Sequence, residues 1–468
     1  MTHRTNVGLL WIAGLLGAPG PMAAAQVVDA GQNVAAKSVP SRPAGVEDVM
    51  AAVSHENLRR VIDHLVTFGT RHTLSETESD TRGIGAARRW LRDELQEIAD
   101  ASGRSDITVE LMVHTQPPQQ RVPNEIEIVN VVMTIPGTLA ESKDRRFVVL
   151  GHYDSRAAGT NDGTSDAPGA NDDGSGTALV LELARVLSTR PCEATTVFLM
   201  TAGEEQGLLG ARWYARTARE NGWRVEAALS NDIVGDPTGP GGKVDRHRVR
   251  LFSEAIPRDL EAQQIARIRT LGMENDSPSR QLARYVHEVA LRHDTSVKPW
   301  VIYRVDRFLR GGDHTAFNEE GFPAVRFTEV EENYDRQHQN VSTRDGRPYG
   351  DVAEFVDERY LADVTRLNGA ALFTLANAPS PPGNARLITA GLRNDTTIRW
   401  ERSPQPDVAG YEVVYRDTTS PFWEVTIDVG DVTEHTLDLN KDNYFFGVRA
   451  YDRDGHRSLV SFPVAAGR

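Results

Sequence analysis

Short apolar runs that each lead to a potential metal ligand occupy residues 147–232. Runs of this length without polar interruption are typical of parallel strands that helices cover on both faces. Ligands of open α/β sheets bind at the carboxyl ends of such strands. We therefore expect the polar residues that follow these runs to meet at one edge of a sheet. They are His152, Glu204, Glu205 and Asp232.

The pattern around these runs alternates between strand and helix. Apolar residues with helical spacing cover 81–99, 177–187 and 206–218, and a further strand-like run lies at 323–328. This alternation predicts an α/β fold, a doubly wound mixed sheet flanked by helices. Residues 235–280 are rich in glycine, proline and charge and contain a strand-like run at 248–253, and we interpret them as an insertion over the site.

The pattern becomes all-β after a proline-rich linker at 379–385. Short alternating strands beyond it predict a small β-sandwich domain over residues 386–468. Trp400, Tyr411 and Tyr444 follow in an order that resembles a fibronectin type III domain, in which Tyr444 would be the tyrosine-corner residue. The absence of cysteine from this part of the chain fits that domain type.

The N-terminus is typical of a secretory signal peptide. A short basic segment precedes an apolar stretch too short to span a bilayer, and small residues precede an expected cleavage site near Ala25-Gln26. We expect residues 1–25 to be removed and residues 26–45 to form a flexible leader. The mature protein would then be secreted or periplasmic. Cys192 is the only cysteine, so no disulfide framework can form within one chain.

The charge balance disfavours two classes of partner. The chain has 52 basic and 66 acidic residues, a formal net charge of -14. An acidic protein has little electrostatic attraction to nucleic acid or to anionic lipid, so we expect neither as a partner. The sequence does not indicate an oligomeric state.

The residue types at the strand ends are suited to zinc, which takes histidine and carboxylate ligands where thiolates are absent. Asp172 and Asp173 lie in a glycine-rich turn, and paired metals need a bridging carboxylate. Of the neighbours Glu204 and Glu205, one can bind metal while the other acts as a general base. Each feature alone has an ordinary interpretation, such as a packing histidine or an acidic helix start. Their joint placement favours a metal-dependent hydrolase.

At these residues the chain resembles the zinc aminopeptidases of peptidase family M28, within the co-catalytic metallopeptidase clan. The similarity covers roughly residues 46–378, which we expect to form a zinc exopeptidase-like domain. The matching motifs are GHYDS at 151–155, GANDDGSG at 169–176, AGEEQGLLG at 202–210, NDIVG at 231–235 and GDHTAF at 312–317.

The resemblance implies a ligand set for two zinc ions per chain, with cobalt or manganese as possible substitutes. Asp172 would bridge the two ions, and its peptide bond to Asp173 would be cis. His152 and Asp232 would complete one metal site. Glu205 and a distal histidine would complete the other.

The resemblance also assigns the residues around the metals. Glu204 would be the general base and acid. Asp154 would orient the imidazole of His152. Asp173 and Asp313 would support the ligands without binding metal themselves. Metal-bound side chains usually need such supporting partners.

Two histidines compete for the distal position. His314 belongs to the Asp-His-x-x-Phe segment, which in the family is normally not the ligand. His338 lies in the loop after the next strand, where the terminal ligand normally follows, and we assign it. The family's usual His-Thr with an acid shortly after is replaced by Gln339-Asn340, which leaves the supporting partner of His338 open.

The function that the resemblance implies is a secreted aminopeptidase that removes N-terminal residues from peptides. A carboxypeptidase or dipeptidase of the same superfamily is the alternative, with Arg304, Arg307 and Arg310 as candidates to hold a terminal carboxylate. A glutaminyl cyclase would lack the first histidine, whereas His152 is present. A non-catalytic peptide-binding protein is the remaining alternative, although the intact ligand set disfavours it.

Overall fold

A mixed β-sheet forms the centre of the structure, a computed structural model that describes residues 42–390 and 393–465. Within these residues the sheet has eight strands in the order β1-β2-β4-β3-β5-β8-β6-β7. They are β1 (Thr108–Gln116), β2 (Ile126–Ile135), β3 (Arg145–His152), β4 (Thr195–Thr201), β5 (Arg224–Asn231), β6 (Arg248–Ser253), β7 (Lys298–Ile302) and β8 (Ala324–Glu329). The predicted signal peptide and most of the predicted leader lie outside the described residues.

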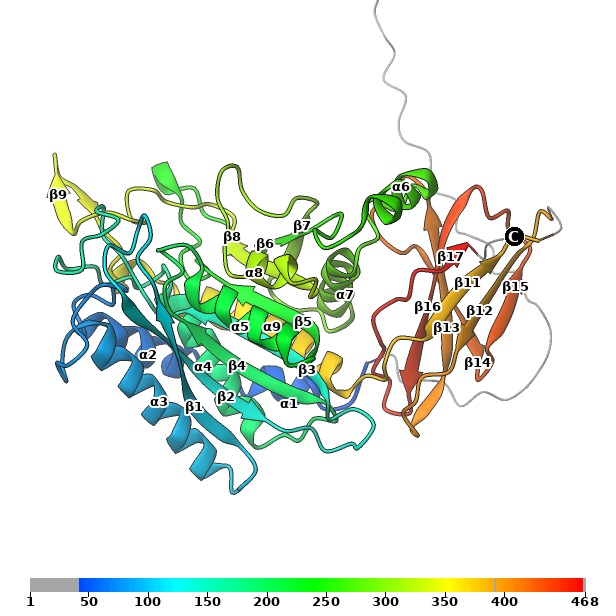
Figure 1. Ribbon diagram of the computed structural model, residues 1–468, viewed down its shortest axis with the longest axis horizontal. Coiled ribbons are helices and arrows are strands. Elements are labelled where there is room, and N and C mark those ends of the chain that lie inside the picture. Colours follow the sequence, from blue (N-terminus) through cyan, green and yellow to red (C-terminus); the bar gives the residue numbers. More distant parts are fainter. Residues whose placement is uncertain (1–41, 391–392, 466–468) are drawn as a thin grey trace, which may run out of the picture. The chain divides into compact units, whose positions relative to one another are not determined.

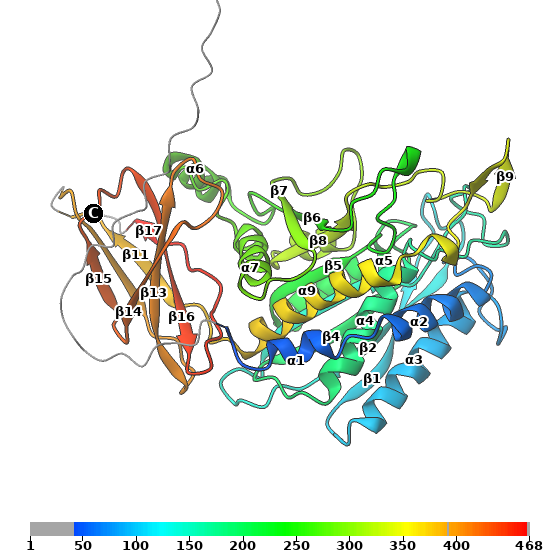
Figure 2. The ribbon, with the colours of Figure 1, turned by 180° about the vertical axis from the view of Figure 1, so that it is seen from behind.

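Helices cover both faces of this sheet (Figures 1 and 2). They are α1 (Val46–Ala51), α2 (His55–Thr67), α3 (Gly83–Ala101), α4 (Gly174–Ser188), α5 (Leu209–Glu220), α6 (Ala262–Leu271), α7 (Pro278–Arg292), α8 (His314–Glu319) and α9 (Glu358–Asn377). None of the described helices is long and apolar enough to cross a membrane.

Alternate residues of the central strands point to opposite faces of the sheet, as the pleat requires. In β3, Val149 lies in the larger hydrophobic core with residues of α1, α2, α3, α4, α7 and α9. Its neighbours Val148 and Leu150 lie in a smaller core with Tyr214 of α5 and Phe317 of α8. The predicted fold, a mixed sheet flanked by helices, is confirmed.

The four central strands place the candidate site. β4, β3, β5 and β8 are neighbours in this order and run parallel. Their carboxyl ends therefore lie at the same edge of the sheet. β3 ends at His152 and β5 ends one residue before Asp232, so these two predicted ligands emerge from adjacent strands.

Within the stretch 235–280 that we interpret as an insertion, residues 248–253 form a strand of the main sheet, β6. β6 pairs antiparallel with β8 and parallel with β7, and so extends the main sheet. Val249 and Leu251 of β6 are fully buried. The composition is misleading because charged residues alternate with these apolar ones, and because the strand's partner β8 comes much later in the chain.

Two smaller sheets follow α9, with strand orders β15-β12-β11-β17 and β14-β13-β16. The strands are β11 (Gly383–Ile388), β12 (Thr396–Glu401), β13 (Val408–Asp417), β14 (Val425–Gly430), β15 (Glu434–Leu437), β16 (Tyr444–Asp452) and β17 (Val464–Ala465). β11 begins inside the stretch that composition predicts as linker. The sheets share a core in which the rings of Trp400 and Tyr411 lie 5.6 Å apart. The all-β character is confirmed, and the likeness to fibronectin type III stays a prediction.

Buried ion pairs connect these sheets to α7, and the described residues belong to one compact unit. Asp276 accepts hydrogen bonds from Arg284 of α7 and from Arg416 of β13, each at 2.8 Å. The three side chains are at most 3% exposed. Removal of one partner from such a group leaves a buried charge unpaired, which costs about 3–5 kcal/mol.

Three carboxylic acids also meet where the loop before β4 contacts the C-terminal sheets. Oxygens of Glu193, Asp407 and Asp452 lie within 4.8 Å of one another. Burial and the neighbouring Asp407 raise the pKa of Glu193 to about 8, and burial raises that of Asp452 to about 7. Unfolded carboxyls titrate near pH 4.

The raised pKa values predict how stability depends on pH. The pKa values of these two carboxyls are higher in the folded than in the unfolded state. Their contribution to folding stability is therefore complete below about pH 4 and is lost as the pH rises through 7 to 8. We expect the melting temperature to fall between pH 5 and 8.5, and to fall less in Glu193→Gln. Calorimetry at matched ionic strength checks this. Identical pH profiles for the two proteins would contradict it.

Candidate metal centre

The predicted site residues converge at the carboxyl edge of the four parallel strands. His152 is the last residue of β3, Glu204 and Glu205 follow β4, and Asp232 follows β5. Asp172 lies in the loop between β3 and α4. His338 lies in the loop between β8 and the hairpin of β9 (Ser342–Arg344) and β10 (Arg347–Tyr349).

Asp172 lies between the two histidines. Its Oδ1 is 3.3 Å from Nε2 of His152, and its Oδ2 is 2.9 Å from Nε2 of His338. His152 Nε2 is also 3.8 Å from Asp232 Oδ1, and His338 Nε2 is 2.7 Å from Glu205 Oε1. The side chains thus form two groups of potential metal ligands, and Asp172 contacts a histidine of each group.

The charges of the two groups are strongly coupled. Burial opposes charge on each of them, but the carboxylates of Glu205 and Asp172 raise the pKa of His338 to about 10. The two histidines in turn hold the pKa of Asp172 well below its usual range. Protons on the imidazoles would therefore balance the charge of the carboxylates. A divalent cation would replace those protons, because a metal ligand must be deprotonated.

The donor atoms fit a pair of divalent cations. His152 Nδ1 lies 3.1 Å from the backbone oxygen of Asp154, to which it can donate. Its Nε2 and Oε1 of Glu205 are buried and make no hydrogen bond of good geometry, although each lies within 3.3 Å of another proposed ligand atom. Buried polar atoms seldom lack partners, and these two point toward the other ligand atoms. Asp172, Glu205 and His338 form one possible metal group, and His152, Glu204 and Asp232 form the other.

Glu204 differs from its neighbour Glu205 in exposure and surroundings. It is partly exposed and lines a cavity, whereas Glu205 is 5% exposed and contacts His338. Burial, together with Asp232 and Glu205, raises the pKa of Glu204 well above its usual range. A carboxyl group with a raised pKa beside a cavity is suited to take up and return a proton.

The three predicted supporting acids contact the ligand segments. The carboxylate of Asp154 accepts from the backbone N–H groups of Glu204 and Glu205, each at 3.3 Å. Asp173 accepts from the backbone N–H of His152 at 3.0 Å, and the Asp172-Asp173 peptide bond is cis. Asp313 is buried and accepts a hydrogen bond from Thr201 at the end of β4.

The alternatives that the sequence left open lie elsewhere. The Nε2 atom of His314 is 2.8 Å from the backbone oxygen of Val305, and this side chain belongs to neither group of ligands. Asp236, a further acid in the segment after β5, is paired with Arg336.

Sequence reasoning missed two buried residues that hold the loop of Asp172. Arg71 is completely buried and donates to the backbone oxygens of Tyr153 at 2.7 Å and Gly169 at 2.8 Å. Asp351 accepts from the backbone N–H of Asn171 at 2.9 Å and of Asp172 at 2.7 Å. Both residues are remote from the motifs in sequence, so no local pattern indicates them.

We expect Asp351→Asn to weaken metal binding by about 10- to 100-fold, which is typical when a supporting partner of a metal ligand is lost. The asparagine side chain has only one oxygen, so its N–H group would face one of the two backbone N–H groups that the carboxylate now accepts from. Titration with a chromophoric chelator measures the affinity. Asp345→Asn, an exposed acid in the β9–β10 turn, is the matched control. Equal affinity of the two variants would contradict a positioning role for Asp351.

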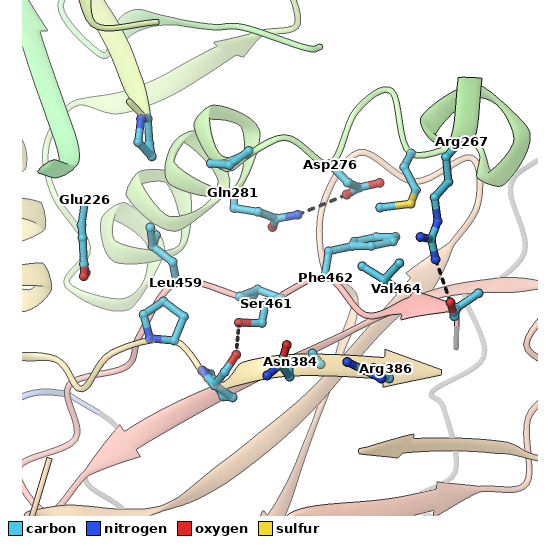
Figure 3. A pocket seen from close by; sticks show the side chains of 18 of the residues that line it. Glu226, Arg267, Asp276, Gln281, Asn384, Arg386, Leu459, Ser461, Phe462 and Val464 are labelled. Atoms are coloured by element: carbon cyan, nitrogen blue, oxygen red, sulfur yellow. Dashed lines mark hydrogen bonds between the residues drawn. The ribbon is translucent and has the colours of Figure 1, made fainter. Parts of the chain in front are cut away.

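A cavity of about 310 Å³ opens beside the candidate centre. Asp172, Glu204, Glu205, Asp232 and His338 line it, so a substrate in it would reach both groups of ligands. A larger cavity of about 870 Å³ lies between α6, α7 and the C-terminal sheets (Figure 3). Its described lining includes Gln281, Arg386 and Phe462 but none of the predicted ligands.

A mixed α/β sheet with histidine and carboxylate groups at the carboxyl ends of adjacent parallel strands is an arrangement suited to a metallopeptidase. The model of peptidase family M28 matches residues 130–357. A protein of Leptosphaeria maculans named "Probable zinc metalloprotease" is 46% identical over 90% of this chain and 98% of its own length. One of Pyricularia oryzae with the same description is 44% identical over 90% of this chain and 84% of its own. The chain therefore belongs to peptidase family M28.

Solved structures show the same fold at much lower identity. The LapA aminopeptidase of Legionella pneumophila is 19% identical and covers 71% of this chain and 74% of its own, with a TM-score of 0.50. LapB of the same organism is 18% identical and covers 73% of this chain and 78% of its own, with a TM-score of 0.50. Membership of a peptidase family makes the chain an enzyme, a metallopeptidase that acts on peptides.

Proposed function

We propose that the protein is a secreted aminopeptidase that uses two zinc ions per chain. The observation that most supports two ions is the position of Asp172, within 3.3 Å of one imidazole and 2.9 Å of the other. The names of the relatives support zinc, and the predicted signal peptide supports secretion. In this proposal His152 and Asp232 would hold one ion, Glu205 and His338 would hold the other, and the carboxylate of Asp172 would serve both.

The proposed chemistry assigns each residue one task. Bound zinc supplies a polarised water and stabilises the charge that develops on the scissile carbonyl. Glu204 accepts the proton of the attacking water and then donates it to the departing amine. Asp154 and Asp173 hold the ligand backbone through their hydrogen bonds. The substrate occupies the cavity that Glu204 lines.

One observation favours the alternative of a carboxypeptidase or dipeptidase. Arg307 and Arg310 line the cavity beside the ligands, where they could meet a terminal carboxylate. Arg304 does not line it and lies over the ring of Phe308 instead. We keep this function as the second candidate.

Hydrolysis of aminoacyl chromogenic substrates, compared with their N-acetylated counterparts, tests the proposal. We expect the free-amine substrates to be cleaved and the acetylated ones to resist. Chelation should abolish the activity, and zinc should restore it. Cobalt or manganese should restore part of it. Cleavage of acetylated peptides from their carboxyl end, with free-amine substrates left intact, would replace the proposal by the second candidate.

A further inference from the structure

Arginine is concentrated around the cavity beside the candidate metal centre. Among the described residues six arginines line it, although the whole chain is acidic with a net charge of -14. They are Arg121, Arg156, Arg212, Arg307, Arg310 and Arg326. The acidic residues of the same lining are Glu204 and three proposed zinc ligands, whose charges bound metal would offset. With zinc bound, positive charge would therefore exceed negative charge in the lining of this cavity.

Four of these arginines have a carboxylate at short range. The pairs are Arg156–Glu205 at 2.7 Å, Arg212–Glu319 at 3.0 Å, Arg307–Glu332 at 2.5 Å and Arg326–Asp232 at 2.9 Å. Arg212 and Arg307 pair with carboxylates that are not proposed zinc ligands, and Arg326 is fully buried, so these three attract a further anion only weakly. Arg156 shares Glu205 with the proposed zinc, but its side chain is only 14% exposed. The remaining two arginines, Arg310 and Arg121, lack a carboxylate partner of this kind in the described part of the chain.

Arg310 has no carboxylate of its own. Its Nη1 is 3.4 Å from Glu332, which already pairs with Arg307 and Arg250. One buried carboxylate thus faces three guanidinium groups. The Arg310 side chain remains 29% exposed, so donors of its guanidinium can reach a ligand in the cavity.

Gln337 places Arg310 close to the reacting centre. The Gln337 Oε1 atom accepts from Arg310 Nη1 at 3.2 Å, and its Nε2 donates to Asp172 Oδ2 at 3.0 Å. Arg310 is therefore separated from the proposed bridging ligand by one side chain. On another side of the cavity, Arg121 is exposed and donates to the backbone oxygen of Glu205 at 3.0 Å. It has no carboxylate partner among the described residues.

We infer that this cavity selects substrates that carry a carboxylate within one residue of the scissile bond. Arg310 is the principal contact and Arg121 the second. The inference rests on the proposed peptidase function and specifies its substrate class. The carboxylate can come from an N-terminal aspartate or glutamate side chain, or from the free carboxyl end of a dipeptide. A planar guanidinium binds either one through paired hydrogen bonds.

Paired substrates that differ only in this charge test the inference. The first arm compares glutamyl and glutaminyl 7-amido-4-methylcoumarin. The second arm compares leucyl-glycine with leucyl-glycinamide. The measured quantity in each arm is the ratio of kcat/KM for the charged substrate to that for the neutral one. The proteins are wild type, Arg310→Gln, Arg121→Gln and the control Arg304→Gln, an exposed arginine of the same loop that lies outside the cavity lining.

We expect a wild-type ratio of at least about tenfold in one arm, since charge-assisted hydrogen bonds contribute strongly to recognition. Arg310→Gln should reduce that ratio by about tenfold, Arg121→Gln by less, and Arg304→Gln should leave it unchanged. The arm that responds identifies the source of the carboxylate. Because each ratio is internal to one protein, a partly misfolded variant does not alter it.

Ratios near one in both arms, or a ratio that Arg310→Gln leaves unchanged, would overturn the inference. The aminopeptidase proposal would survive that result if the neutral aminoacyl substrates are cleaved. Conversely, charge selection in the leucyl-glycine arm alone, with no aminoacyl coumarin cleaved, would support the inference and refute the aminopeptidase proposal. The two failures are therefore distinguishable.

Discussion

Glu204→Gln is expected to lower kcat by about 10²- to 10⁴-fold, the range that a positioned general base contributes. The amide keeps the size of the side chain but cannot accept the proton of the attacking water. Substrate binding through other residues remains, so KM should change only slightly. Zinc content should remain at two ions per chain, because the proposed ligands are all intact.

The adjacent glutamate provides the matched comparison. Glu205→Gln is the same substitution one residue later, on a side chain that lies 2.7 Å from His338. It should lose zinc as well as activity. If Glu204→Gln loses zinc to the same extent, Glu204 is a ligand rather than a base, in line with its place near His152 and Asp232. Steady-state kinetics and metal analysis of both variants separate these results.

Asp172→Asn is expected to reduce zinc binding more than any single change at an outer ligand. One carboxylate faces both imidazoles, so the substitution weakens both proposed metal positions. Wild type dialysed against excess zinc should hold two ions, and Asp172→Asn one or none. Asp166→Asn is the control, because this exposed acid lies in the same connection between β3 and α4.

The loss of zinc should also appear in thermal stability. A ligand that binds only the folded state stabilises it by about 2.7 kcal/mol at 100 times its dissociation constant. We therefore expect zinc to raise the melting temperature of wild type and of Asp166→Asn, but not that of Asp172→Asn. An equal zinc-dependent increase in all three proteins would contradict the bridging role.

The ligand segments could be predicted from sequence because local patterns determine their positions. An apolar strand of about six residues brings the next polar residue to the edge of the sheet, and parallel neighbours bring such residues together. His152, Glu205 and Asp232 all follow this rule. His338 does not lie at a strand end, and only the resemblance to a family distinguished it from His314.

The parts that sequence did not predict depend on contacts between remote segments. β6 is recognisable as a strand of the main sheet only through its pairing with β8. Asp351 and Arg71 act through hydrogen bonds to backbone groups of distant loops. Arg326 offered a signal that could have been used, since it lies between the apolar residues Val325 and Phe327 of β8 and is fully buried beside Asp232.

Anomalous diffraction at the zinc edge, from crystals of the zinc-loaded protein, tests the two-metal centre most directly. We predict two peaks about 3.5–4 Å apart, the separation typical of paired catalytic metals. One should lie beside His152 and Asp232, the other beside Glu205 and His338, with the Asp172 carboxylate between them. A single peak, or a second peak remote from Asp172, would contradict the account.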